Sequence, residues 1–314
     1  MNCLLKLAAA AMLAAGAGAA GAQAHVADAD RCLSITSNPD LAIQYCTRAI
    51  ESGRFAGADL ARLHYGRGVE WAAKADFDRA IADYDAAIRL SPDFADAYYN
   101  RGNAWANKGE PDRAIADYGA AIRLNPKDSA PYVGRAIELT LKGEYARAIA
   151  DYETTLRANP KSDVAYFGRG RAYFYSGDYL RAIADFEQAL KLDSNAYTPI
   201  WVYLARKRVG APTAEQDLDA DTRSFRSGAW PSTLIVFFLG RTDAASVFAA
   251  ATDPDPKLQS ENRCEANFYL AHWHLLRREQ EKALPLLREA ESSCPKNIIE
   301  YEGAVAELRR LQQR

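Results

Sequence analysis

The chain has 314 residues, of which 49% are hydrophobic and 25% are charged, the proportions of an ordinary globular protein. These fractions exclude a mainly disordered chain. The formal net charge of −2 lacks the basic excess of nucleic-acid-binding proteins, so we expect no nucleic-acid partner. The length suits two ordinary domains or one continuous repeat array.

Residues 1–24 have the composition of a secretory signal peptide. Lys6 is the only charged side chain there, an Ala/Leu-rich run surrounds it, and the stretch ends in the small-residue pattern Ala22-Gln23-Ala24. The alternative is a membrane anchor, but the Leu-rich part is short for a span of about 20 apolar residues. We therefore expect cleavage near Ala24, a periplasmic or secreted protein, and no stable membrane span.

An internal repeat organises the middle of the chain. The string Arg-Ala-Ile-Ala-Asp-aromatic recurs every 34 residues, beginning at Arg79, Arg113, Arg147 and Arg181. In each unit, small and aromatic residues recur three and four positions apart, the spacing of one helical face, and Gly or Pro residues separate two such stretches. The sequence predicts four pairs of antiparallel helices over residues 61–196, preceded by a helical cap over residues 25–60.

The second unit shows the repeat pattern most clearly, at Tyr98, Gly102, Trp105, Ala114, Tyr118, Ala121 and Pro126. These residues resemble the tetratricopeptide repeat (TPR) family. The resemblance implies an all-α fold, a right-handed α-solenoid in which each helix pair buries its apolar face against its neighbours. It also implies a concave surface, lined by the first helix of each pair.

The 34-residue register fails after the fourth unit. We expect a helical carboxy-terminal region over residues 197–314 that ends in a further TPR-like pair. Its motif residues are similar to those of NlpI-type periplasmic TPR lipoproteins, at Trp201, Trp230, Pro231, Gly240, Tyr269, Ala283, Pro295 and Tyr301. That resemblance implies an adaptor that presents envelope proteins, such as peptidoglycan hydrolases, to an envelope protease or to each other. The lipid-attachment cysteine of those lipoproteins is missing here, which puts membrane tethering in doubt.

Four cysteines remain after the predicted cleavage, an even number that favours disulfides in an exported protein. Cys264 begins the first helix of the last pair and Cys294 ends its second helix, so an antiparallel arrangement makes them neighbours. Cys32 and Cys46 lie on the two helices of the amino-terminal cap. Of the three pairings that four cysteines allow, we predict Cys32–Cys46 and Cys264–Cys294.

We predict no enzymatic activity, no cofactor and no metal site. The only dinucleotide-like glycine pattern, at residues 16–21, lies inside the predicted signal peptide. His272 and His274 are two residues apart, which on a helix directs them away from a common metal. We expect both to be ordinary helix residues, with His274 at a core position. The Asp residues of the repeated string follow the structural period, which predicts helix-surface or inter-repeat hydrogen bonds rather than acid–base chemistry, at Asp83, Asp117, Asp151 and Asp185.

The faces of the first helices that do not pack within a pair predict a partner-binding groove, with contacts from Tyr99, Asn103, Asn107, Phe167, Arg171, Phe174 and Tyr175. Aromatic anchors beside Arg and Asn suit other proteins or extended peptides. The alternative is that these aromatics pack against the superhelix or the carboxy-terminal helices.

The resulting hypothesis is an exported, non-enzymatic adaptor or scaffold that binds envelope proteins through the concave TPR face. Two alternatives stay open: a cell-envelope hydrolase with a non-standard site in the 197–263 insertion, and a structural, self-assembling protein. A homodimer is compatible with the sequence.

Overall fold

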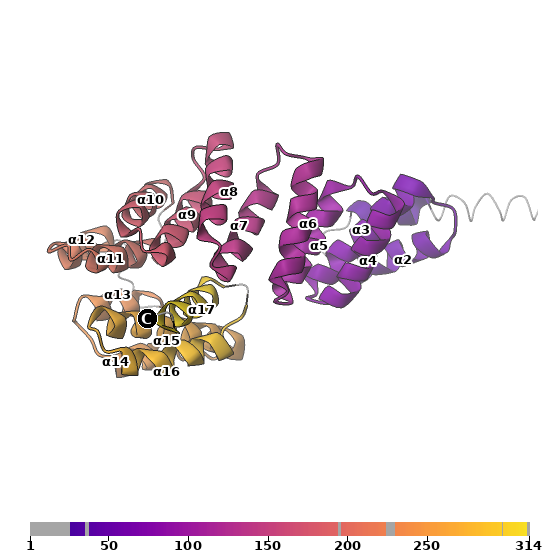
Figure 1. Cartoon of the computed structure of the whole chain (residues 1–314). Coiled ribbons are helices and arrows are strands. Elements are labelled where there is room, and N and C mark those ends of the chain that lie inside the picture. The colour runs from indigo at the N-terminus through magenta and orange to yellow at the C-terminus, as the bar shows by residue number, and fades with distance from the viewer. Residues whose placement is uncertain (1–25, 35–37, 194–195, 224–229, 297, 313–314) are drawn as a thin grey trace, which may run out of the picture. The chain divides into compact units, whose positions relative to one another are not determined.

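In the computed structural model, helices joined by turns make up the described residues, which are 26–34, 38–193, 196–223, 230–296 and 298–312 (Figure 1). No strand occurs among them, which confirms the predicted all-α fold. The predicted signal peptide lies outside these residues. Within them, no helix combines the length and the apolar character that a bilayer crossing requires.

The chain divides into two compact units, and each has its own packing. Unit 1 comprises residues 1–108 and 116–125, and unit 2 comprises residues 109–115 and 126–314. Besides a helix over residues 26–34, unit 1 contains α2 (Pro39–Glu51), α3 (Gly57–Ala73), α4 (Phe77–Leu90) and α5 (Ala95–Asn107). The boundary divides α6 (Pro111–Leu124) between the two units.

Close helix packing in unit 1 depends on a glycine at the same position of successive repeats. A Cβ atom on Gly102 would lie 2.9 Å from the Tyr118 ring, and one on Gly68 would lie 2.8 Å from the Tyr84 ring. Both tyrosines are buried. The glycines therefore let a large aromatic side chain lie directly on the backbone of the partner helix.

An Arg–Asp ion pair joins the two helices of every repeat. The Arg67 guanidinium donates to both carboxylate oxygens of Asp83 at 2.8 Å. Two-bond contacts with the same separation of 16 residues recur at Arg101–Asp117, Arg135–Asp151 and Arg169–Asp185. The four Asp residues thus make structural hydrogen bonds, as predicted, but their shared partner lies within the repeat rather than between repeats.

Unit 2 contains the third and fourth repeats and the helices that follow them. The repeats consist of α7 (Ala130–Lys142), α8 (Tyr145–Ala158), α9 (Asp163–Ser176) and α10 (Tyr179–Leu192). The later helices are α11 (Thr198–Arg208), α12 (Ala214–Asp221), α13 (Ser232–Phe238), α14 (Ala244–Ala250), α15 (Pro256–Leu276), α16 (Gln280–Ser293) and α17 (Ile299–Gln312).

The last helices of unit 2 fold back onto its repeats. Helix α17 contacts both α7 and α15, which places this helix beside the third repeat (Figure 1). Trp201 lies at the centre of the shared core, with its ring 5.5 Å from Phe174 and 5.9 Å from Phe268. Repeat helices and carboxy-terminal helices therefore bury their apolar surface in one cluster.

Both predicted cysteine pairs lie at disulfide-bonding distance. Cys32 and Cys46 join the helix over residues 26–34 to α2 in unit 1, and Cys264 and Cys294 join α15 to the end of α16 in unit 2. Each disulfide ties together two adjacent helices.

Candidate functional site

We call the inner face of unit 1 the surface of α3 and α5 that carries Arg62, Tyr65, Tyr99, Asn103 and Asn107. A hollow of about 530 Å³ lies at one end of this face. It is lined by Leu33, Ala58, Arg62, Tyr65, Ser91, Asp93, Phe94 and Asp96. Arg62 and Tyr65 stand 34 residues before Asp96 and Tyr99, so corresponding positions of two repeats form the surface.

The floor of this hollow is held in place by aromatic and polar contacts. The Tyr65 ring lies 4.8 Å from the Phe94 ring, and the Asn100 side-chain amide donates to the Tyr65 hydroxyl at 2.7 Å. Burial, followed by the nearby Asp96 carboxylate, raises the pKa of Tyr65. Beside this fixed floor, Leu33 remains 44% exposed. The hollow thus offers apolar contact next to an Arg and two Asp side chains.

The three predicted groove residues of the second repeat lie on the same inner face. Tyr99 is partly buried, with its ring 5.9 Å from the Tyr118 ring, and the Tyr118 hydroxyl donates to Asn103 at 2.7 Å. Asn107 is exposed, and its amide donates to the Asn103 backbone oxygen at 2.9 Å. Intramolecular contacts therefore orient the two asparagines while they remain accessible.

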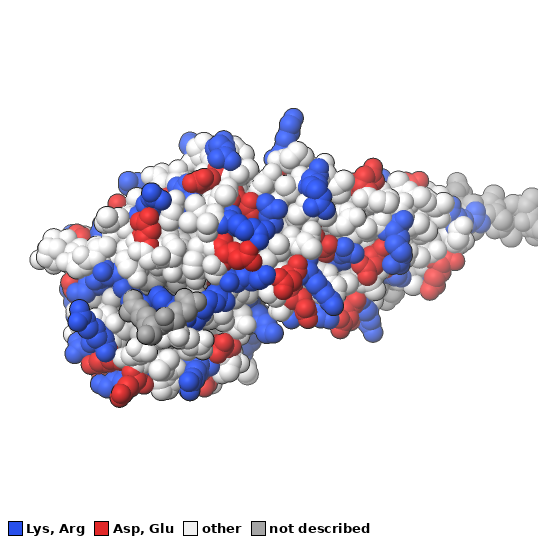
Figure 2. All heavy atoms as spheres, in the orientation of Figure 1, with Lys and Arg blue, Asp and Glu red and all other residues white. Residues whose placement is uncertain are grey.

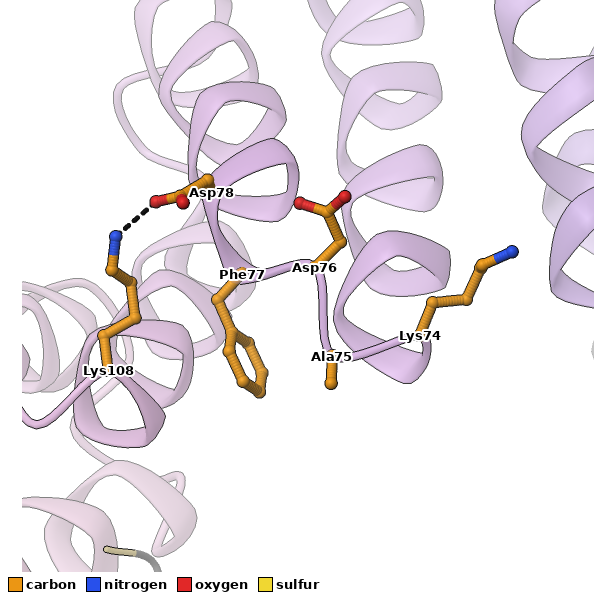
Figure 3. Close-up of a pocket in the computed structure, with 6 residues that line it drawn as sticks. All are labelled: Lys74, Ala75, Asp76, Phe77, Asp78 and Lys108. Carbon is orange, nitrogen blue, oxygen red and sulfur yellow. Dashed lines mark hydrogen bonds and ion pairs between the residues drawn. The ribbon is translucent and has the colours of Figure 1, made fainter.

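A second hollow of unit 1, about 350 Å³, lies at the turn between α3 and α4. Figure 3 shows Lys108 reaching the Asp78 carboxylate at its edge, while the Phe77 ring points away from the two Asp carboxylates. Lys74, on the other side, is paired with Asp40. Its lysines are thus already engaged in ion pairs that link successive helix pairs. A pair of the same kind joins Asp112 and Lys142 in unit 2. We assign this hollow a structural role.

Charge is distributed evenly on the face shown in Figure 2, where acidic and basic side chains are interspersed on both units. No single-sign patch appears in that view. Such a surface suits contacts between neutral or mixed-charge proteins better than a polyanion.

The predicted groove residues of the fourth repeat lie in the core of unit 2. Arg171 is 3% exposed, Phe174 2% and Tyr175 6%, and Phe167 packs half-buried against the same cluster. The prediction of an open groove at these four residues is wrong, because α15 and α17 cover this face. The alternative, packing against the carboxy-terminal helices, describes them correctly.

An ion pair between residues far apart in the sequence joins α17 to the repeat helix α9. Arg171 on α9 donates to Glu302 on α17 at 3.0 Å, across a sequence separation of 131 residues. Both side chains are almost fully buried, at 3% and 5% exposure. Burial raises the pKa of Glu302 although Arg171 opposes the shift. A buried pair of this kind fixes the register of two packed helices.

Two further carboxyls near Glu302 have strongly shifted pKa values. Burial and then the charge of Glu302 raise the pKa of Glu138, on α7, to about 7. Burial and then Glu265 raise the pKa of Glu300, on α17, to about 8, although the Tyr269 hydroxyl donates to it at 3.2 Å.

His272, rather than His274, is the core histidine of α15. Its side chain is fully buried, and burial lowers its pKa to about 3. Its Nδ1 lies 3.9 Å from the Glu307 carboxylate, a distance too long for a hydrogen bond. His274 is half-buried and bonds to Glu279 through Nδ1 at 2.7 Å. The prediction that His274 occupies a core position is wrong, because the face of α15 that carries His272 is the one that packs on the repeats.

Sequence reasoning missed two groups of residues: those that line the unit 1 hollow and those of α17 that cover the fourth repeat. Arg62 and Phe94 line the unit 1 hollow, and the 34-residue period indicates Arg62, since it precedes Asp96 by one repeat. Glu302 and Gly303 are the residues of α17 that contact Arg171 and Tyr175 of the fourth repeat. The signal for that cover is the run Tyr173-Phe174-Tyr175, because consecutive aromatics point to different sides of a helix, and a helix that is apolar all round is buried.

Comparison with protein families identifies the repeats. Models described as TPR repeat and tetratricopeptide repeat match residues 73–109 and 95–128, and a further tetratricopeptide repeat model matches residues 136–197. Residues 73–128 and 136–197 are therefore tetratricopeptide repeats, in agreement with the sequence pattern. No curated protein matches the sequence.

Solved structures share the fold. A tetratricopeptide repeat protein from Parabacteroides merdae is similar with a TM-score of 0.55 at 20% identity, over 79% of this chain and 98% of that one. The carboxy-terminal part of a TPR repeat-containing protein from Cytophaga hutchinsonii gives 0.53 at 18% identity, over 90% and 98%. MamA from Desulfovibrio magneticus gives 0.51 at 20% identity, over 53% and 96%. At these identities the likeness concerns the fold alone.

Proposed function

We propose that the chain is an exported, non-enzymatic adaptor that binds proteins or extended peptides through the inner face of unit 1. The observation that carries this proposal is the hollow beside Tyr65, which ends on α5 at Asp96. Tyr99, Asn103 and Asn107 follow on the same helix and are partly or fully exposed. TPR arrays use such inner faces as extended binding surfaces.

The chemistry of this face favours a peptide with an apolar anchor residue. Leu33 and Phe94 supply apolar contact at the hollow. Oriented Asn side chains beyond it are suited to hydrogen bonds with a peptide backbone, whatever its sequence. Arg62 and the carboxylates of Asp93 and Asp96 add charges of both signs, which select the flanking residues of the ligand.

Export is part of the proposal. The composition of residues 1–24 supports it, and so do two cysteine pairs at bonding distance, because disulfides persist in oxidising compartments. The resemblance to NlpI-type proteins adds peptidoglycan hydrolases and an envelope protease as partners. Amino-terminal sequencing of the protein recovered from periplasm should begin at His25, and a sequence beginning at Met1 would contradict cleavage.

The binding face is tested by crosslinking followed by co-purification from periplasmic extract. The unmodified protein should recover envelope proteins, and the double variant Tyr99→Ala/Asn103→Ala should recover at least tenfold less. Leu180→Ala is the matched control, because Leu180 is 72% exposed in unit 2. Equal recovery by the double variant and the control would place binding elsewhere.

The alternatives make different predictions. An envelope hydrolase with a site in the 197–263 insertion requires turnover of peptidoglycan or casein that one substitution in that segment abolishes. The described side chains Trp201, Leu234 and Ile235 of this segment are fully buried in the core. A self-assembling structural protein, including a homodimer, should show a multiple of the chain mass by light scattering and no co-purified partner.

A further inference from the structure

Helix α17 occupies the inner side of the repeats in unit 2 almost as a bound ligand would. Seven of its residues are buried, and among its described residues only Gln312 is exposed. Its backbone packs most extensively on α16 and then on α15 and α7, and its side chains also reach α9 and α11. We call its contact with α7, α9, α11 and α15 the seam. The seam lies on the face of α9 that corresponds to the inner face of α5 in unit 1.

Three contacts define how α17 fits the seam. Glu302 accepts from Arg171 at 3.0 Å. Gly303 lies against Tyr175 and Phe268, so that a Cβ atom there would come within 2.4 Å and 2.5 Å of them. At the far end Arg309 donates to the Leu141 backbone oxygen at 2.9 Å. The contact of α17 with α9 thus consists of a carboxylate facing Arg171 and, next to it, a residue without a side chain facing Tyr175.

Several buried polar atoms at the seam lack a hydrogen-bond partner, unlike those in the rest of the described structure. Buried side-chain nitrogen and oxygen atoms without a hydrogen-bond partner occur, among the described residues, only on α9, α11, α15 and α17. They include two nitrogens of Arg171, one oxygen of Glu302, the Tyr175 hydroxyl and both ring nitrogens of His272. Buried polar groups are normally paired, and an unpaired one destabilises its surroundings. These atoms regain partners when water or another helix replaces α17.

We propose that α17 is an exchangeable occupant of the seam: it opens, and a helix of a partner protein takes its place, with a carboxylate facing Arg171 and a glycine facing Tyr175. The resident helix is tethered and therefore competes at an effective concentration of about millimolar. A free partner helix binds well only when α17 is weakened or when its own contacts satisfy the unpaired atoms.

A labelled synthetic peptide with the sequence of residues 298–312 serves as the probe, added to the full-length protein. Gly303→Ala weakens the packing of α17 on Tyr175 and Phe268, and it leaves the sequences of α7, α9 and α11 unchanged. We expect at least tenfold tighter peptide binding to this variant than to the unmodified protein. Gln312→Ala, at the exposed end of α17, is the matched control and should leave affinity unchanged. A peptide carrying Gly303→Leu should not bind either protein.

Two results would overturn the proposal: equal binding of the two peptides, or no gain from Gly303→Ala over Gln312→Ala. If Gly303→Ala fails to fold, Arg309→Ala replaces it, since Arg309 is only partly buried. Hydrogen exchange on the unmodified protein gives an independent answer. Amides of α17 should exchange at least tenfold faster than those of α9, and equal protection would mean that α17 opens only on global unfolding. Neither experiment depends on Tyr99 or Asn103, so the proposed function is tested separately.

Discussion

The first two and the last two repeats carry the same 34-residue pattern, but their inner faces differ. In unit 1 this face keeps Tyr99, Asn103 and a hollow accessible. In unit 2 the corresponding face carries Arg171 and Phe174 and lies under α15 and α17. The comparison teaches that the repeat motif sets the internal packing of each helix pair, whereas distant residues decide whether its inner face stays accessible or is covered.

The largest effect should come from breaking the buried ion pair of the covered face. Arg171→Ala leaves Glu302 buried without its partner, and we expect a loss of about 3–5 kcal/mol in unfolding free energy. Arg135→Ala removes a more exposed pair and should cost about 1 kcal/mol. Denaturant titration measures both. The double variant Arg171→Met/Glu302→Met should recover most of the loss, and a loss as large as that of Arg171→Ala would show that the charge imbalance is not the cause.

Removing the disulfides should reveal how far each unit depends on its cross-link. In the chain-entropy model, a 30-residue loop between Cys264 and Cys294 contributes about 3–4 kcal/mol, and the 14-residue loop between Cys32 and Cys46 about 3 kcal/mol. We expect the double variant Cys264→Ser/Cys294→Ser to lower the melting temperature more than Cys32→Ser/Cys46→Ser. The reverse order would indicate that unit 1 depends more strongly on its cap.

Glycine substitutions compare the two kinds of helix contact directly. Gly303→Ala should destabilise by about 1–3 kcal/mol, because its Cβ atom meets Tyr175 and Phe268 below contact distance. Gly102→Ala, with 2.9 Å to Tyr118, should lose less. Gly66→Ala is the control, since its nearest atom is a movable Leu33 methyl at 3.2 Å. Thermal unfolding should rank the three in this order, and a loss for Gly66→Ala as large as that for Gly303→Ala would contradict the packing argument.

Stability should fall as pH rises from 7 to 9, by on the order of 2 kcal/mol. Burial raises the folded-state pKa of Glu138 to about 7 and of Glu300 to about 8. Their contribution is complete below the unfolded pKa of about 4.3 and is lost as pH rises through the folded values. His272, whose pKa is lowered, acts in the opposite direction below about pH 6.5.

The measurement is the unfolding midpoint at several pH values. Glu138→Gln should reduce the fall between pH 7 and 9, whereas Glu110→Gln, an exposed control, should not. Identical profiles for the two variants would remove Glu138 from the explanation.

Much of the fold could be predicted because its signals are local. The 34-residue period gives the helix pairs, and the placement of Cys264 and Cys294 on the two helices of one pair gives their pairing. The predicted helix start at Cys264 is wrong, because α15 already begins at Pro256. The same period predicts a structural role for Asp117, although it does not reveal that Arg101 is the partner within the repeat.

The cover of unit 2 could not be predicted in the same way. The charged residues of α17, such as Glu302 and Glu307, are typical of a solvent-exposed helix when considered alone. Only the tertiary fold reveals that Glu302 meets Arg171, 131 residues earlier. Because that contact is non-local, the sequence alone predicts an open groove at Arg171 and Phe174. Tyr99 and Asn103 lie on an accessible face, since no described helix of unit 1 covers them.

The Arg–Asp pair of each repeat has a consequence for how such a chain can change in length. Both partners lie within one 34-residue segment, separated by 16 residues. A duplication or deletion of one whole segment therefore adds or removes the Arg together with its Asp partner. Neither charged side chain is left buried without the other. Arrays built from this unit can lengthen or shorten by recombination without compensating mutations at that position.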